Sequence, residues 1–204
     1  MNIFMFSSFL TTHKVKRIMG KLTQKKTIAY IPAGWRDTPD FFYGGAYSAI
    51  GFRHGLSFPI GQYYDPGRER VAFDCGAIHL GGGNTFEFLA MMKMRGLLPK
   101  LREYVKNGGI LIGTSAGSIL MCPSIHIAGF ADPNYYLDDD ELGSLGLVDF
   151  DMKPHWDFWR TRKDMFADFQ KESGRTLYCL RETQGIHVDD KGVHFLGGVP
   201  DTFI

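Results

Sequence analysis

Long apolar runs, excess charge and repeats are all absent from this 204-residue sequence. No stretch approaches the roughly 20 consecutive apolar residues of a membrane-spanning helix, which argues against a membrane partner. The 23 basic and 22 acidic residues leave a formal net charge of +1, so the composition offers no basic surface for nucleic acid. Without repeats, low-complexity tracts or linkers, the length predicts one globular domain over residues 1–204.

Cysteine is also scarce. The three cysteines, Cys75, Cys122 and Cys179, are far apart in the sequence. They form neither a metal-binding pattern nor a disulfide framework, which favours a reducing compartment. Residues 2–10 are mostly apolar but have no basic residue before them and no small-residue cleavage motif, so they do not match a signal peptide. We therefore expect a cytoplasmic protein.

The most informative stretch is GGILIGTSAGSILM, residues 108–121. A glycine pair is followed by a short apolar run typical of a buried strand, and then by Ser115 between small residues. A serine flanked by glycines at a strand-to-helix turn is the layout of a nucleophile elbow, because the glycines leave room for a sharp, strained backbone. The N–H groups at the start of the next helix would then face developing negative charge. A serine that only caps a helix gives the same short pattern.

A second glycine-rich loop, GGGNT at residues 81–85, follows a predicted buried strand. Its spacing matches neither a dinucleotide-binding fingerprint nor a P-loop, since no Gly-Lys-Ser/Thr follows. Its backbone can approach a ligand closely and supply an N–H donor for an oxyanion, and Asn84 or Thr85 can cap the next helix. A plain tight turn is the simpler interpretation of the loop taken alone.

Strands and helices alternate along the chain, which predicts an α/β fold with a mainly parallel sheet and helices on both faces. The alternating tail around residues 189–192 predicts a C-terminal β-hairpin. In such a sheet the loops after neighbouring strands meet at one edge, so the GGGNT loop and Ser115 are expected side by side. The strands are predicted at residues 3–6, 27–32, 56–60, 77–80, 110–112, 145–152 and 176–180, and helical segments at 42–52, 68–73, 85–94, 99–107 and 160–169.

A serine hydroxyl becomes a nucleophile when a base takes its proton, and that base is usually a histidine held by a carboxylate. Of the seven histidines, only His155 stands just past a predicted strand end, beside a proline that fixes the turn. The others lie inside a strand, in the terminal hairpin or in segments of uncertain position. A surface histidine without a catalytic role is the alternative interpretation.

Two carboxylates are candidates for orienting His155. Glu182 closely follows the strand predicted at residues 176–180, whereas Asp132 gives the chain order Ser, Asp, His of the α/β-hydrolase fold. The chain after Ser115 is short for the later strands and the lid of that fold, so we prefer Glu182. Asp132 stays open as the alternative.

Five segments carry a resemblance to peptidase family S51, the serine peptidase family of dipeptidase E and cyanophycinase. They are IHLGGGNTFEFL, RGLLPKLREYVKNGGILIGTSAGSILMCPSI, ADPN, LGLVDFDMKPHW and LRETQGIHV, in the family's order, and they cover most of residues 78–188. The resemblance implies a flavodoxin-like sheet related to the class I glutamine amidotransferase domain. It also implies Ser115 as nucleophile, His155 as base and Glu182 as acid, with the N–H groups of Gly83 and Ala116 as the oxyanion hole.

The chain departs from dipeptidase E beside two of these residues. Thr114 and Thr183 stand where that enzyme has tryptophan before its nucleophile and glycine after its acid. Its preference for aspartate is associated with an arginine in the helix after the histidine, and Arg162 is the nearest match here. We predict substrate-binding roles for Asn84, Thr114, Asp132 and Arg162.

The sequence thus predicts a serine exopeptidase that acts on dipeptides or short peptides, Asp-X dipeptides among them. We expect it to work as a monomer or homodimer, without a cofactor or metal. One alternative is a non-catalytic member of the same fold that binds a small ligand or a protein. Another is a cyanophycinase-like hydrolase of β-aspartyl-arginine, although the chain is short for the loops that such a polymer needs.

Overall fold

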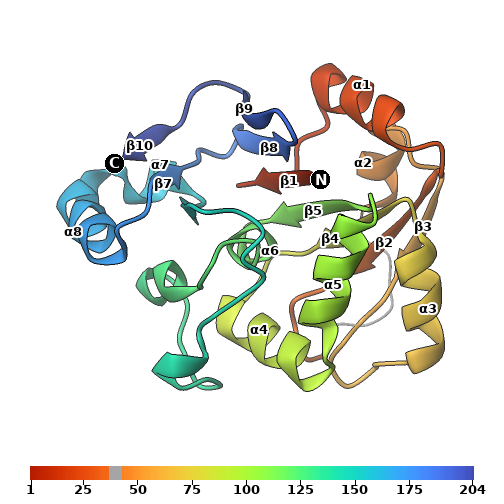
Figure 1. Ribbon diagram of the computed structural model, residues 1–204, viewed down its shortest axis with the longest axis horizontal. Helices are drawn as coiled ribbons and strands as arrows, with labels where there is room; N and C mark the ends of the chain where they lie inside the picture. Colours follow the sequence, from red (N-terminus) through yellow and green to blue (C-terminus); the bar gives the residue numbers. More distant parts are fainter. Residues whose placement is uncertain (37–42) are drawn as a thin grey trace.

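A seven-stranded sheet forms the centre of the molecule in the computed structural model, which describes residues 1–36 and 43–204 (Figure 1). A run of parallel strands is completed at one end by an antiparallel pair, so the expected mainly parallel α/β sheet with a C-terminal hairpin is confirmed. In spatial order the strands are β3 (His54–Ser57), β2 (Thr27–Ile31), β4 (Ala77–Leu80), β5 (Ile110–Thr114), β1 (Asn2–Phe6), β8 (Gly185–Asp189) and β9 (Gly192–Leu196).

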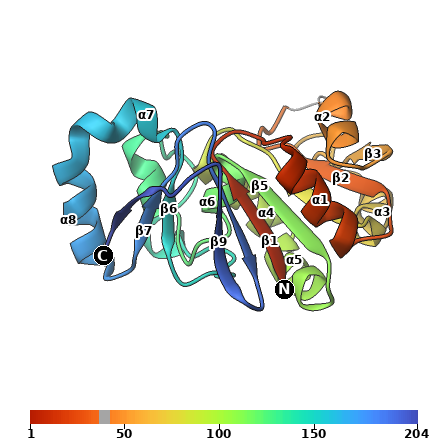
Figure 2. The same ribbon diagram turned by 90° about the horizontal axis from the view of Figure 1, so that it is seen from above.

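Helices cover both faces of this sheet, as expected (Figure 2). The alternation of side chains along β1 shows why two cores form: Ile3 and Met5 point into one, and Phe4 and Phe6 into the other. The Phe4 side is covered by α1 (His13–Leu22) and α2 (Gly44–Ala49). The other side is covered by α3 (Pro66–Asp74), α4 (Thr85–Met94), α5 (Leu97–Lys106) and the short α6 (Ala116–Ile119).

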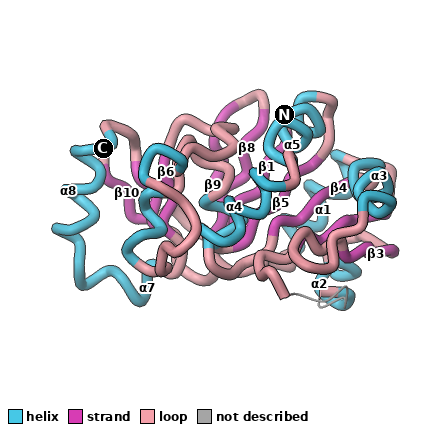
Figure 3. Tube along the Cα trace, turned by 90° about the horizontal axis from the view of Figure 1, so that it is seen from below, coloured by secondary structure: helices cyan, strands magenta, loops and turns pink. Residues whose placement is uncertain are grey.

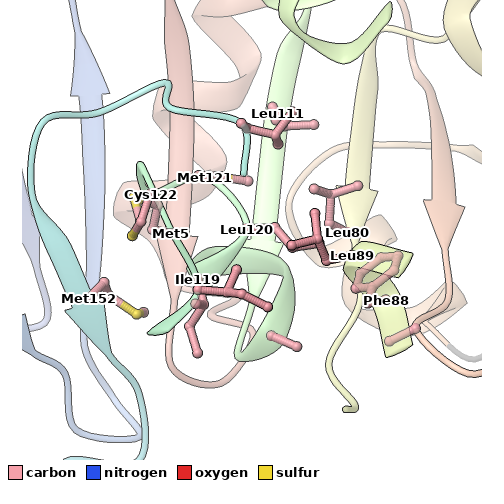
Figure 4. Packing of buried hydrophobic residues seen from close by; sticks show 14 of the residues in the cluster. Met5, Leu80, Phe88, Leu89, Leu111, Ile119, Leu120, Met121, Cys122 and Met152 are labelled. Atoms are coloured by element: carbon pink, nitrogen blue, oxygen red, sulfur yellow. The ribbon is translucent and has the colours of Figure 1, made fainter. Parts of the chain in front are cut away.

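The short helix α6 lies deep in the larger of these cores (Figure 4). Ile119 and Leu120 lie between Leu89 on α4 and Met152 on a strand of a second sheet, and both are almost completely buried. Full burial of such an aliphatic side chain stabilises a fold by about 1.5–3 kcal/mol. Close packing therefore fixes the turn that precedes α6.

A second, three-stranded sheet lies beside the main one and was not predicted by the alternation of elements (Figures 1 and 3). Its strands are β6 (Asp151–Lys153), β7 (Leu177–Cys179) and β10 (Asp201–Phe203), in the order β10-β7-β6. The helices α7 (Trp156–Trp159) and α8 (Lys163–Ser173) lie on the side of this sheet that faces away from the main sheet. Neither α7 nor β10 has a counterpart in the prediction.

The strand predicted over residues 145–152 is wrong for residues 145–150, because only the end of that segment is a strand. The backbone of residues 145–147 forms hydrogen bonds with the segment at the end of α6. Leu145 N donates to Leu120 O at 3.0 Å, and Leu147 N donates to Met121 O at 2.9 Å. The Arg102 guanidinium donates to the Leu145 carbonyl at 2.8 Å. A buried loop and a buried strand give the same short apolar pattern, and periodicity does not separate them.

Other predicted elements are present with shifted boundaries. The strand expected at residues 56–60 is β3, which begins at His54. The helix expected at 42–52 corresponds to α2, and residue 42 lies outside the described residues. The helix expected at 160–169 opens with a 3₁₀ turn and continues as α8 until Gly174 ends it with a φ of 65°. None of the helices among the described residues has the length and apolarity needed to cross a membrane.

Gly117 makes the closest backbone approach that holds α6 against the sheet. A Cβ atom built on Gly117 would lie 2.1 Å from the Leu80 carbonyl oxygen, so the Gly117→Ala variant must push α6 away from β4. We expect the free energy of unfolding in urea to fall by about 2–3 kcal/mol. Gly20→Ala on the exposed face of α1 is the matched control, since nothing lies within 4 Å of its Cβ position. The control should gain about 0.5–1 kcal/mol, and equal effects of the two variants would contradict the packing described for α6.

Candidate active site

Ser115 occupies a strained turn between β5 and α6. Its φ and ψ angles are 52° and −114°, a region that residues other than glycine rarely adopt. Hydrogen bonds hold the turn from both sides: Ser115 N donates to Phe6 O at 3.0 Å, and Gly117 N donates to Gly81 O at 2.9 Å. The buried Ser118 hydroxyl lies 2.9 Å from both the N–H and the carbonyl of Phe6. The predicted nucleophile elbow is thus tied to β1 and to β4.

The GGGNT loop lies directly beside Ser115, as the order of the strands predicts. A Cβ atom on Gly82 would be 3.3 Å from the Ser115 Cβ, so glycine at that position leaves room for the serine. Gly83 has a φ of 151° and packs against Ala33, whose Cβ lies 2.8 Å from the Cβ position of Gly83. The N–H groups of Gly83 and Ala116 donate to no other described residue in the hydrogen bonds of the structure. Gly83 follows the glycine that lies against Ser115, and Ala116 follows Ser115 itself, so both N–H groups belong to segments beside the serine.

His155 follows β6 in a left-handed conformation, with a φ of 59°. Its Nε2 atom lies 2.9 Å from Ser115 Oγ, which is hydrogen-bond distance. Its backbone N–H donates to the Ser7 hydroxyl at 2.8 Å, and the next residue, Trp156, donates from its backbone N–H to Leu180 O at 2.9 Å. Among the described residues other than glycine, only Ser115 and His155 have a positive φ.

Glu182 lies on the other side of the His155 ring. Its Oε1 atom is 2.6 Å from His155 Nδ1, and its Oε2 atom accepts a hydrogen bond from the Ser8 hydroxyl. Partial burial would raise the pKa of the carboxyl, but the hydrogen bonds from Ser8 and His155 outweigh it and lower the pKa below its ordinary value. An ionised Glu182 keeps the Nδ1 proton on its own side, so that the Nε2 lone pair faces the Ser115 hydroxyl.

Asp132 is not placed to orient His155. Its Oδ2 atom accepts hydrogen bonds from Thr85 N at 2.8 Å and from Thr85 Oγ1 at 2.6 Å. Asn84, the N-cap of α4, accepts from Glu87 N at 2.9 Å and donates from Nδ2 to Pro133 O at the same distance. Both residues, which the sequence predicts to bind substrate, connect the segment around residue 132 to the helix that follows the GGGNT loop.

Lys153 is a buried cation on β6, the strand that leads to His155. The side chain is 2% exposed, and its Nζ atom lies 4.4 Å from the centroid of the Trp159 ring. Burial lowers the pKa of Lys153 to about 8, against the opposing charge of Asp132.

Thr114 and Arg162 make contacts that do not involve the Ser115 hydroxyl. The Thr114 hydroxyl lies 2.8 Å from Nε2 of His79, whose Nδ1 is 2.6 Å from the Tyr47 hydroxyl. His79 is fully buried, and burial lowers its pKa to about 3, so the ring is neutral. The Arg162 guanidinium lies over the Trp159 ring, 5.4 Å from its centroid.

Sequence reasoning missed Ser7, Ser8 and Asp201 as supports of the site. Ser7 and Ser8 hold His155 and Glu182, and the Asp201 carboxylate accepts a hydrogen bond from the Trp156 indole next to His155. The signal for the serines was present, since two hydroxyl residues directly follow a buried strand. Asp201 lies in a short strand that no pattern marks. Among the described residues no group of three or more His, Cys, Asp or Glu side chains is arranged to hold a metal ion.

Chemically, the arrangement of an activated hydroxyl, an oriented imidazole and two free N–H donors suits attack on a carbonyl carbon. The model of peptidase family S51 matches residues 5–196 of the chain. A Drosophila melanogaster protein named as an alpha-aspartyl dipeptidase is 28% identical over 187 residues, which are 87% of this chain and 75% of that protein. Peptidase E of Salmonella typhimurium is 30% identical over 154 residues, which are 71% of this chain and 61% of that enzyme.

Solved structures share the fold. A Listeria monocytogenes EGD-e protein assigned to peptidase E superposes with a TM-score of 0.76 at 23% identity, covering 97% of this chain and 98% of that one. A peptidase from an acI-B1 actinobacterium gives a TM-score of 0.68 at 17% identity, covering 99% and 93%. At such low identities the likeness shows the fold alone.

The contacts of Glu182 and Asp132 predict different effects when each charge is removed. Glu182→Gln should slow the labelling of Ser115 by a fluorophosphonate probe by roughly 10³–10⁴-fold, because the amide no longer fixes the proton on His155 Nδ1. Asp132→Asn keeps an oxygen for Thr85, so its labelling rate should fall by less than about tenfold. Labelling rates followed by mass spectrometry make the comparison, and the reverse order of effects would assign the orienting role to Asp132.

Proposed function

The chain belongs to peptidase family S51, a family of serine-type peptidases, and from this premise we propose that it is an exopeptidase that hydrolyses dipeptides or short peptides. The observation that carries the proposal is the unbroken series Ser115 Oγ, His155 Nε2, His155 Nδ1 and Glu182 Oε1, with separations of 2.9 and 2.6 Å between the partners. The series begins at the strained turn between β5 and α6. A serine that only caps a helix needs neither partner.

In the first step His155 takes the proton of Ser115 as the Oγ atom attacks the scissile carbonyl. The resulting imidazolium is stabilised by the Glu182 carboxylate, which stays ionised. The N–H groups of Gly83 and Ala116 donate to the oxyanion of the tetrahedral intermediate, and one such donor is worth roughly 3–4 kcal/mol in comparable sites. His155 then donates its proton to the departing amine, and the acyl group remains on Ser115.

The second step is hydrolysis of this acyl-enzyme. A water molecule takes the place of the departed amine, and His155 removes its proton as it attacks the ester carbonyl. Return of the proton to Ser115 Oγ releases the acid product. The same two N–H donors serve both tetrahedral intermediates, so the rigid attachment of α6 and the GGGNT loop benefits both steps.

The names of the relatives suggest the size and kind of substrate. The Drosophila protein is named for alpha-aspartyl dipeptides, and the Salmonella enzyme is a peptidase E. Dipeptides with aspartate as the first residue, such as Asp-Leu, are therefore the first substrates to test. X-Leu dipeptides with other first residues serve as the comparison. Arg162 lies against Trp159 in the layer that covers the second sheet, so an acidic side chain would have to reach it there.

Loss of the Ser115 hydroxyl is the direct test. Ser115→Ala should lower kcat for dipeptide hydrolysis by roughly 10⁴-fold or more and abolish fluorophosphonate labelling, because no other group can form the acyl-enzyme. Ser48→Ala is the matched control and should keep full activity, since Ser48 is an exposed serine on α2 whose hydroxyl donates to Gly44 O of the same helix. Full dipeptidase activity of Ser115→Ala would rule out the serine mechanism. A wild-type protein that the probe does not label would indicate a binding protein instead of a peptidase.

A further inference from the structure

A hollow of about 650 Å³ lies beyond the GGGNT loop, outside the groups already described. It is lined by Gly34, Trp35, Arg36, Glu87 and Tyr136. These residues come from three segments: the loop after β2, the first turn of α4, and the segment that follows Asp132. Hydrogen bonds of Asn84 and Asp132 join the last two segments to each other. The wall of the hollow is therefore connected to the GGGNT loop.

Ala33 and Gly83 connect the hollow with the loop beside Ser115. Ala33 immediately precedes Gly34 and packs against Gly83, whose N–H is one of the two oxyanion donors. Glu87 stands on the helix that begins directly after Gly83 and Asn84. A substrate whose carbonyl oxygen is bound at Gly83 therefore has the hollow as its next neighbour.

The order of the strands sets the direction of the substrate. At this edge of the sheet β1, β5, β4 and β2 are successive neighbours. His155 and Glu182 rest on the serines that follow β1, Ser115 follows β5, the GGGNT loop follows β4, and the hollow follows β2. His155 must reach the departing amine, so the departing part of the substrate lies on the β1 side. The part that becomes the acyl group then extends over the GGGNT loop toward the hollow.

One carboxylate and one guanidinium line the hollow, those of Glu87 and Arg36, and the carboxylate is the group that can bind a cation. Glu87 is half-buried, and its Oε1 atom accepts a hydrogen bond from Trp35 N at 3.1 Å, which fixes the carboxylate at the wall. Trp35 and Tyr136 line the same hollow and are 37% and 48% exposed, so aromatic residues in the wall are open to solvent. A carboxylate with aromatic faces next to it binds an ammonium group by charge attraction and by cation–π contact.

We propose that this hollow is the subsite for the first residue of the substrate, and that Glu87 binds its α-ammonium group. The inference rests on the proposed peptidase function and adds to it the reason for exopeptidase action: a free amino terminus is required. The other charged or titratable groups at the hollow are Arg36 and Tyr136 in its wall, with Asp132 nearby, held by Thr85.

Glu87→Gln is the test, because the amide oxygen can still accept from Trp35 N while the charge is lost. Asp-Leu and Ala-Leu are each compared with their N-acetyl derivatives. Wild-type protein should favour the free amine by about 100-fold in kcat/KM, and Glu87→Gln should reduce that preference at least tenfold, mainly through KM. Glu172→Gln, an exposed carboxylate on α8, removes the same charge elsewhere and should leave the preference unchanged.

A pH profile of the wild-type protein gives a second measurement that needs no variant. The α-ammonium group of a peptide loses its proton near a pKa of about 7.7–8.0, so kcat/KM for the free amine should decline above that pH. The decline should be absent for the N-acetyl derivative and for Glu87→Gln. Labelling of Ser115 by fluorophosphonate is followed in parallel. If Glu87→Gln is labelled normally, cleaves dipeptides and keeps the wild-type preference for the free amine, the subsite proposal alone is overturned. If the wild-type protein is not labelled and cleaves no dipeptide, the peptidase function is overturned and the subsite with it.

Discussion

The end of β1 is the constraint on which the rest of the site depends. Ser115 follows a strand of the main sheet, whereas His155 and Glu182 follow strands of the second sheet. Three consecutive residues join them: Phe6 accepts from Ser115 N at 3.0 Å, the Ser7 hydroxyl accepts from His155 N at 2.8 Å, and the Ser8 hydroxyl bonds to Glu182. Because one short segment contacts all three catalytic candidates, their mutual distances are set locally. A shift of the second sheet would have to break these bonds before it could separate His155 from Ser115.

Two strained residues show where this constraint acts. A left-handed conformation in a residue other than glycine costs of the order of 1–3 kcal/mol, and it persists only where the surroundings fix it. At Ser115 the surroundings are the Phe6 bond and the packing of α6, while at His155 they are the Ser7 bond and the indole of Trp156 bonded to Asp201. The C-terminal strand β10 therefore has a role at the site, although its own residues lie at the far side of the second sheet.

The sequence predicts which residues meet at Ser115 better than it predicts the scaffold around them. The parallel strands of the main sheet, the helix at Thr85–Met94 and the hairpin follow local patterns that tertiary contacts reinforce, and the structure contains them. Strand ends carry polar side chains in a recognisable way, which is why Ser115, His155 and Glu182 could be selected and why their proximity was foreseeable. The division into two sheets was not foreseeable, because strands as short as β6 and β10 have no period to read. Substrate-binding roles were predicted for Asp132, Asn84 and Thr114 from their position beside the site. Their observed hydrogen bonds, to Thr85, Pro133 and His79 respectively, depend on side-chain directions that spacing does not specify.

As the nucleophile of a serine peptidase, Ser115 must carry the acyl group during turnover. Rapid acid quenching during hydrolysis of an aspartyl or alanyl p-nitrophenyl ester, followed by mass spectrometry of the peptide that contains Ser115, measures this directly. The account predicts an initial burst of p-nitrophenol and a Ser115 peptide heavier by the mass of the acyl residue. Steady hydrolysis with no adduct on Ser115 under any quench time, or an adduct on another residue, would contradict it.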